Sequence, residues 1–369
     1  MSENSFTVKD AISKLVLAEN LRDYEADAAM EEIMAGIATP SQIAAFLTAA
    51  RMKGPTIEEL AAFAGTMRRH ARAIHPKVSS RLVDTCGTGG DRLKTFNIST
   101  IAALVTAGAG VCVAKHGNRS NSSKCGSADL LERLGVNINA DPQTVTNSIE
   151  QANIGFMFAP VFHPAMKFAA APRKEIGIRT VFNVLGPLTN PAGAKAQVVG
   201  VYDESLVFPI AEVLNKLGAE DALVVHGLDG IDEISLVGRT RAARLIRGEI
   251  GELMLEPSTF GLKHRPSHEI SADDAELEDY AAVAYSILSR GNEILSVRES
   301  ATKEMVLMNS AAALVTAGAV DSYIEGVEMA RRSIDSGSAL KKLEALVKIT
   351  GGDLSRIESL TRAKLERTQ

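Results

Sequence analysis

Residues 82–109 read LVDTCGTGGDRLKTFNISTIAALVTAGA, which is a short β-rich run, a glycine-rich loop and an apolar helical pattern in direct succession. Similar apolar runs recur between amphipathic segments, at VCVA (111–114), IGFMF (154–158), AQVVGVY (196–202) and DALVVHG (221–227). Strands that alternate with helices are typical of a parallel sheet buried by helices on its faces. Residues 234–256 alternate between apolar and polar residues instead of forming continuous apolar runs, which indicates an antiparallel excursion of the sheet. The sequence therefore predicts an α/β fold with a mostly parallel central sheet flanked by helices.

The start of the chain carries helical signals without a strand pattern. Thr39 is followed by Pro40, and Thr56 with Glu59 forms a capping box. Threonine caps and proline at the first helical position are common helix starts. We therefore expect a smaller all-helical N-terminal domain over residues 1–78 and an α/β domain over residues 79–369.

Composition excludes several classes of protein. The 369 residues are 46% hydrophobic and 23% charged, with a formal net charge of −5, so no basic field favours nucleic acid or an anionic membrane. The three cysteines are an odd number without CxxC spacing, which argues against a disulfide framework and a structural zinc site. The N-terminus lacks a signal pattern and the apolar runs are too short to span a bilayer. A cytoplasmic protein is expected.

The loop after the first strand has the chemistry of an anion site. Gly87, Gly89 and Gly90 permit positive φ and leave backbone N–H groups accessible, and a helix begins just downstream. Asp91 is unusual beside phosphates, unless it orients donors or touches a metal ion. By itself the pattern leaves a phosphate site and a plain tight turn both open.

The loop after VCVA is the densest polar stretch, KHGNRSNSSKCGSAD at residues 115–129. Its lysines and hydroxyls precede a helix, although a solvated loop would also carry them. The carboxyl ends of parallel strands share one crevice, so this loop and the glycine loop could grip the two ends of one polyanion.

Two later segments add charged candidates. Arg173 and Arg179 could each bind a carboxylate with a planar guanidinium. A structural ion pair is an open alternative for Arg173 and the favoured interpretation for Arg179. His163, before a proline, is more typical of a capping or packing residue. Asp232 and Glu233 lie with Asp229 in an acidic loop, where repulsion favours a bound magnesium ion bridged to phosphates over a merely solvated turn.

Four ordered motifs carry a resemblance to a known family: GTGGD (87–91), KHGNRSxSSKxGSADxLExLG (115–135), RKxxGIRTxFNxLGPLxNP (173–191) and HGxDGxDE (226–233). Together, and over most of the chain, they resemble the anthranilate phosphoribosyltransferase family. The resemblance implies transfer of phosphoribose from phosphoribosyl pyrophosphate (PRPP) to the amino group of anthranilate, in tryptophan biosynthesis. It also implies that helices from about residues 163–190 join the helical domain, and that a homodimer forms through that domain.

The resemblance assigns site residues by their positions in these motifs. Gly87, Asn118, His116 and Arg173 match anthranilate-binding positions, with Arg173 on the carboxylate. Ser99, Asp232 and Glu233 match metal-binding positions, which implies two magnesium ions per site. The positions that match the PRPP site are Gly87, Gly90, Asp91, Thr95, Asn97, Ile98, Ser99, Thr100, Lys115, His116, Gly117, Asn118, Arg119, Ser120, Asn121, Ser122, Ser123 and Ser127.

No single catalytic residue is assigned, because the aniline acceptor is already neutral and the reaction mainly requires positioning and stabilisation of pyrophosphate. Asn121 and Cys125 depart from the family's usual choices, as small polar changes that should leave phosphate binding intact. The alternatives are a pyrimidine nucleoside phosphorylase of the same fold and a non-catalytic relative that binds nucleic acid. The net charge of −5 gives the latter little support.

Overall fold

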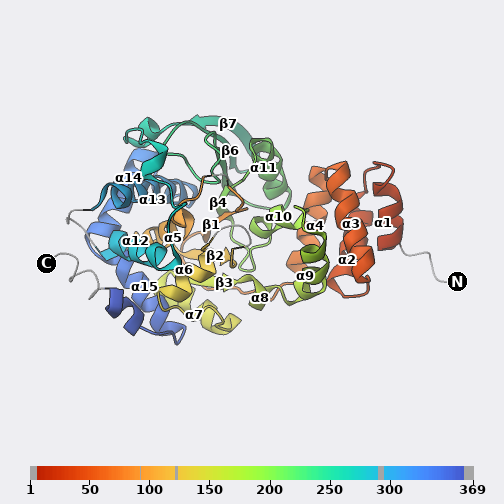
Figure 1. Ribbon diagram of the computed structural model, residues 1–369, viewed down its shortest axis with the longest axis horizontal. Coiled ribbons are helices and arrows are strands. Elements are labelled where there is room, and N and C mark those ends of the chain that lie inside the picture. The colour runs from red at the N-terminus through yellow and green to blue at the C-terminus, as the bar shows by residue number, and fades with distance from the viewer. Residues whose placement is uncertain (1–5, 92, 121–123, 290–294, 361–369) are drawn as a thin grey trace.

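The computed structural model describes residues 6–91, 93–120, 124–289 and 295–360. A helical bundle and a larger α/β unit lie side by side, with the bundle on the right in Figure 1. The bundle helices are α1 (Val8–Leu15), α2 (Asp23–Met34), α3 (Pro40–Lys53) and α4 (Ile57–Arg69). The threonine caps form as predicted, because the hydroxyls of Thr39 and Thr56 accept hydrogen bonds from the backbone three residues later.

The sheet of the α/β unit has seven strands in the order β3-β2-β1-β4-β5-β6-β7. Strands β1 to β5 are parallel, whereas β6 and β7 are antiparallel, so the predicted mostly parallel sheet and its antiparallel excursion are confirmed. The strands are β1 (Val83–Gly87), β2 (Val113–Gly117), β3 (Ile154–Phe158), β4 (Ala196–Gly200), β5 (Asp221–Gly227), β6 (Thr240–Ile246) and β7 (Glu249–Leu255).

The strand order reverses at β1. The chain moves outward from β1 through β2 to β3, and then returns to pair β4 with the other edge of β1, where Gly87 lies opposite Gly200. Parallel sheets bind ligands beyond the carboxyl ends of strands at such a switch point. The glycine loop therefore begins at the position where this topology favours a site.

Helices cover both faces of the sheet (Figure 1). One hydrophobic core packs one face of the sheet against helices from the middle and end of the chain. The other core packs the opposite face against the helix Val207–Lys216 and the bundle. The longer helices of this unit are α5 (Ile98–Gly108), α6 (Ser127–Arg133), α7 (Pro142–Ala152), α11 (Val207–Lys216), α12 (Leu277–Ser289), α13 (Val297–Thr316), α14 (Tyr323–Asp335) and α15 (Ser338–Ile349). Within the described ranges, no helix combines the length and apolar character that a bilayer crossing requires.

A segment from the middle of the chain returns to the bundle. It contains α8 (Ala159–Phe162), α9 (Lys167–Ile176) and α10 (Phe182–Leu185), together with the 3-10 turns η1 (Pro164–Met166) and η2 (Gly186–Leu188). Ala169 and Leu185 share a buried cluster with Phe46 and Phe63 of the bundle. The bundle core is thus built from two distant parts of the sequence. The remaining 3-10 turns are η3 (Glu204–Leu206), η4 (Pro257–Phe260) and η5 (Ser267–Glu269).

Candidate active site

The loop GTGGD (87–91) is hydrogen-bonded to β4 and to the acidic turn, which is the segment after β5 that contains Asp229, Asp232 and Glu233. The Thr88 N–H donates to the Gly200 carbonyl at 2.9 Å, and the Gly89 N–H donates to Asp232 Oδ2 at 2.8 Å. A Cβ atom at Gly87 would lie 2.6 Å from the same Asp232 oxygen, so the close approach requires glycine. The N–H of Gly89, which we expected to face an anion, is therefore taken by a carboxylate.

Lys115 and His116 lie within β2 and not in the loop where the sequence suggested them. Their side chains are 2% and 4% exposed, because pairing with β3 continues through Gly117. The Lys115 ammonium donates to the Thr85 carbonyl oxygen. Lys115 also lowers the pKa values of two carboxyls, the buried Asp84 and the half-buried Glu233, against the effect of their desolvation. The strand tolerates a buried lysine because this charge has carboxyl neighbours.

Asp84 is a buried residue of this region that the sequence reasoning missed. Its carboxylate accepts hydrogen bonds from the His116 N–H at 3.2 Å and from Asn190 Nδ2 at 2.7 Å. Burial raises the pKa of Asp84 to about 6, although Lys115 opposes that shift. The signal was an aspartate inside an apolar strand, since a buried charge requires compensating partners.

Two histidines face each other beside η2. The ring centroids of His116 and His163 are 5.0 Å apart, and His116 Nδ1 lies 3.1 Å from the Gly186 carbonyl oxygen. Burial lowers the pKa of His116 to about 3 and that of His163 to about 4, so both rings are neutral. Neither Nε2 atom has a hydrogen-bond partner among the described residues. His163 therefore packs, as its sequence context suggested, but it packs against a predicted site residue.

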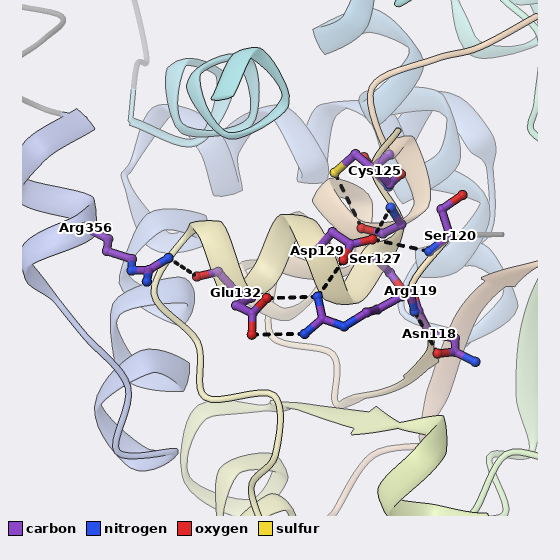
Figure 2. A network of polar contacts seen from close by, with 10 residues as sticks. Asn118, Arg119, Ser120, Cys125, Ser127, Asp129, Glu132 and Arg356 are labelled. Carbon is purple, nitrogen blue, oxygen red and sulfur yellow. Dashed lines mark hydrogen bonds and ion pairs between the residues drawn. The ribbon is translucent and has the colours of Figure 1, made fainter. Parts of the chain in front are cut away.

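The polar loop after β2 is held against α6 (Figure 2). The Arg119 guanidinium forms ion pairs with Asp129 at 2.6 Å and Glu132 at 2.9 Å, and these contacts raise its pKa further. The Gly126 N–H donates to Asp129 Oδ2 at 2.9 Å. Ser120 donates its N–H to the same oxygen at 3.3 Å, so Asp129 holds both sides of the loop. The predicted positions Asn121, Ser122 and Ser123 lie outside the described residues.

Asn118 and Ser127 close the base of this loop. The Ser127 hydroxyl donates to the Asn118 carbonyl oxygen at 3.2 Å, and the Asn118 side chain accepts from the Arg119 N–H at 2.8 Å. A Cβ atom at Gly117 would lie 2.3 Å from the Ser127 hydroxyl oxygen. Glycine at the end of β2 therefore allows the loop to turn back onto α6.

The start of α5 joins the two loops. Asn97 adopts a left-handed conformation with φ of 47°, and its Nδ2 donates to the Cys125 carbonyl oxygen at 3.0 Å. Ile98 and Thr100 are buried, so their side chains contribute to packing, while Thr95 is half-buried. Of these predicted residues, Asn97 has the clearest structural role, as a link between the glycine loop and the polar loop.

The acidic turn after β5 meets the glycine loop and α5. The Ser99 N–H donates to Glu233 Oε1 at 3.0 Å, while the neighbouring Asp232 accepts from the Gly89 N–H. Burial and repulsion by Asp232 raise the pKa of Glu233 to about 8, and burial also raises that of Asp232. Asp229 turns away and accepts from the Ser235 hydroxyl at 2.9 Å.

This donor set suits magnesium. Two half-buried acidic side chains that repel each other, next to a serine, provide oxygen ligands and a need for positive charge. In the described part of the chain, no group of three or more His, Cys, Asp or Glu side chains could enclose a metal ion. A metal ion at this turn would therefore need further oxygens, such as those of a bound phosphate.

Two arginines follow on α9 and the turn after it. The Arg173 guanidinium lies 5.1 Å from the ring centroid of Phe182, and burial lowers its pKa. Arg179 donates through Nη2 to the Gly90 carbonyl oxygen at 2.7 Å and stacks 4.2 Å from the ring centroid of Tyr202. The structural ion pair that the sequence favoured for Arg179 is not formed with any described residue, because the guanidinium meets a backbone carbonyl and an aromatic ring instead. Asp91, on the same loop, pairs with Lys94 at 3.1 Å.

Comparison with known proteins is consistent with this geometry. Residues 9–71 match the family model "Glycosyl transferase family, helical bundle domain", and residues 79–340 match "Glycosyl transferase family, a/b domain". The anthranilate phosphoribosyltransferase of Moorella thermoacetica is 49% identical over 343 residues, which is 92% of this chain and 97% of that protein.

Solved structures agree. The anthranilate phosphoribosyltransferase of Thermus thermophilus has a TM-score of 0.85 and 43% identity, and the match covers 92% of this chain and 99% of that chain. The enzyme of Saccharomyces cerevisiae in complex with PRPP and Mg has a TM-score of 0.84 and 28% identity, with 93% and 98% covered. The resemblance read from the four motifs is confirmed. The chain belongs to the anthranilate phosphoribosyltransferases, glycosyltransferases of tryptophan biosynthesis.

Proposed function

We propose that this chain transfers the phosphoribosyl group of PRPP to the amino group of anthranilate beyond the carboxyl ends of β1, β2 and β5, releasing pyrophosphate. The observation that carries the proposal is the convergence of the glycine loop, the polar loop and the acidic turn at one edge of the sheet. Three separate strand ends are linked there by hydrogen bonds. This arrangement suits a ligand with phosphates at both ends.

The PRPP side of the reaction depends on charge stabilisation. Cleavage of the anomeric C–O bond leaves an oxocarbenium-like centre and a highly charged diphosphate, so positioned donors supply most of the stabilisation. The GTGGD loop and Lys115, with the Asn118–Ser127 loop, hold the donor in this proposal. Ser99, Asp232 and Glu233 would hold magnesium, two ions per site, and bound magnesium neutralises diphosphate charge as a Lewis acid.

The acceptor side requires orientation more than proton transfer. Arg173 binds the anthranilate carboxylate with its planar guanidinium, and Asn118 with His116 lines the approach of the ring. The rings of His116 and His163 are neutral and buried, so they offer apolar faces beside an aromatic acceptor. An aniline nitrogen needs no strong base, and no single catalytic residue is assigned.

We also propose that the protein is a cytoplasmic homodimer whose subunits associate through the helical domain. Exposed apolar side chains on the bundle, Leu17, Tyr24, Ile37 and Met52, support such a contact. Light scattering of the purified chain tests the association. A monomer at micromolar concentration would contradict it.

Loss of anthranilate fluorescence on addition of PRPP and magnesium tests the reaction. We expect turnover that needs all three components. Phosphorolysis of thymidine or uridine, without consumption of anthranilate, would instead identify a pyrimidine nucleoside phosphorylase.

The double variant Asp232→Asn with Glu233→Gln tests the metal site. It retains the shape of the acidic turn but removes both ionisable carboxyls, so the magnesium concentration for half-maximal rate should rise at least about tenfold. Asp229→Asn, which alters the carboxylate that faces Ser235, is the matched control. An unchanged magnesium response in the double variant would mean that the turn is only solvated.

A further inference from the structure

We propose that Arg179 binds the diphosphate leaving group of PRPP as a further ligand at the rim of the glycine loop. This inference rests on the proposed function of the site and adds to it a residue outside the predicted phosphate-binding set. Three features of Arg179 support it. The guanidinium is held by the glycine loop, it has no carboxylate partner among the described residues, and its contact with Gly90 leaves other N–H donors for a ligand.

The guanidinium is fixed on the loop that the diphosphate would occupy. Its Nη2 donates to the Gly90 carbonyl oxygen at 2.7 Å, and its plane stacks on Tyr202. Tyr202 is itself tied to the loop, because its N–H donates to the Thr88 hydroxyl at 3.0 Å. Gly90 has φ of 84°, and a Cβ atom there would lie 2.5 Å from Arg179 Nη2. Glycine at this position therefore admits the arginine.

Four other cations on or beside the glycine loop and the polar loop already have carboxylate neighbours. Lys94 pairs with Asp91, Arg119 with Asp129 and Glu132, and Lys124 with Glu276. Lys115 is electrostatically coupled to the carboxyls of Asp84 and Glu233.

Arg179 differs from these cations because no carboxylate of a described residue lies within ion-pair distance of it. The Gly90 carbonyl is neutral, so this contact orients the guanidinium without cancelling its charge.

The remaining donors suit a phosphate. An arginine has five N–H donors in a planar fork, and one contact to Gly90 leaves the others for a ligand. Stacking on Tyr202 restricts the rotation of the side chain, which lowers the entropy lost on binding. Arg179 lies on the turn six residues after Arg173, so the segment assigned to the acceptor also reaches the leaving group.

The test measures magnesium pyrophosphate binding by calorimetry, with the full-length chain and the variants Arg179→Gln and Arg179→Lys. Arg179→Gln retains an N–H donor for Gly90 but no charge, and should weaken pyrophosphate binding about tenfold, with a similar rise in KM for PRPP. The KM for anthranilate should stay within about twofold. Arg179→Lys should recover part of the affinity at low salt, since it restores the charge.

Arg247→Gln is the matched control, because Arg247 lies on the exposed turn between β6 and β7, at the edge of the sheet opposite the strand carboxyl ends. Wild-type pyrophosphate affinity in Arg179→Gln would overturn the proposal. Equal weakening in the Gln and Lys variants would also overturn it, because that result indicates a mechanical clamp on Gly90. Wild-type protein that binds pyrophosphate without consuming anthranilate would instead contradict the proposed reaction.

Discussion

Arg173 is half-buried against Phe182 without a carboxylate partner among the described residues, so the cation is partly desolvated and a ligand carboxylate could pair with it. We expect Arg173→Ala to raise the KM for anthranilate about tenfold or more, because a charge-assisted contact to the carboxylate is lost. The KM for PRPP should change less than about twofold. Steady-state kinetics with Lys174→Ala as the neighbouring control measures this difference. Equal effects on both substrates would remove the carboxylate role.

The neutral histidine pair makes stability depend on pH. The folded pKa of His163 is about 4, below the ordinary value of about 6.5, so only the unfolded chain takes up a proton between these values. Stability is therefore lost as pH falls from about 6.5 towards 4, at up to about 1.4 kcal/mol per pH unit. Asp84 acts in the opposite direction between about pH 4 and 6, because its folded pKa is raised.

The variant His163→Gln separates the contribution of His163 to the pH dependence of stability from that of Asp84. Its free energy of unfolding should fall less between pH 7 and pH 5 than that of the wild type, by about 1–2 kcal/mol. Urea denaturation at both pH values measures the difference. Parallel pH dependence of the two proteins would show that the His163 ring does not remain neutral in the folded state.

The structural roles of individual residues differ in how far the sequence predicts them. The loop glycines were partly predictable, because Gly89 and Gly90 adopt positive φ of 65° and 84° whereas Gly87 does not. The burial of Lys115 was not predictable, because the carboxyls near it come from β1 and from the turn after β5. The partner of Arg179 was not predictable either, since a backbone carbonyl 89 positions away leaves no mark in the side-chain pattern.

At the scale of elements, α6 and the loop before it behave as one unit (Figure 2). Asp129 accepts from the N–H groups of Ser120 and Gly126 as well as from Arg119, so it fixes the loop on both sides. We expect Asp129→Asn to raise the KM for PRPP about fivefold to tenfold and to leave the KM for anthranilate nearly unchanged.

The control for this variant is Glu132→Gln, which weakens only the Arg119 pair. It should have a smaller effect on the KM for PRPP, since exposed ion pairs contribute little. If Glu132→Gln matched Asp129→Asn, the arginine pair and not the loop closure would govern PRPP binding.

Helices with strong caps were predictable as elements, and the strand boundaries were less so. Thr39 and Thr56 cap their helices through contacts three residues away, which the sequence displays directly. The β2 strand extends to Gly117, past the expected end at residue 114, because it pairs with β3 through that residue. Pairing between strands that are distant in sequence depends on tertiary contacts, so local patterns do not define it.

At the scale of the whole molecule, Arg68 ties the bundle to the α/β unit. Its Nε donates to the Leu188 carbonyl oxygen at 2.7 Å and its Nη1 to the Leu217 carbonyl oxygen at 3.0 Å. Arg68→Met leaves two carbonyls without their charged donor, so we expect the free energy of unfolding to fall by about 2–4 kcal/mol. Arg72→Met, in the exposed turn after α4, serves as control.

Denaturant titration of both variants measures this loss. A destabilisation of Arg68→Met no larger than that of Arg72→Met would mean that the apolar core alone holds the two parts together. The sequence shows Arg68, Arg69 and Arg72 as a basic run at the end of a helix, where cations complement the helix dipole. It did not show that one of these arginines would reach across to two loops of the other unit, because those loops approach only in the folded chain.

The return of α9 and α10 to the bundle limits how this protein can be recombined with its relatives. A chimera that exchanges residues 1–75 alone would confront Ala169 and Leu185 with a foreign set of neighbours in place of Phe46 and Phe63. Exchange of both segments together would preserve the packing, and it would also transfer Arg173 and Arg179. Any laboratory exchange of the bundle that keeps its core intact is therefore an exchange of part of the proposed site as well.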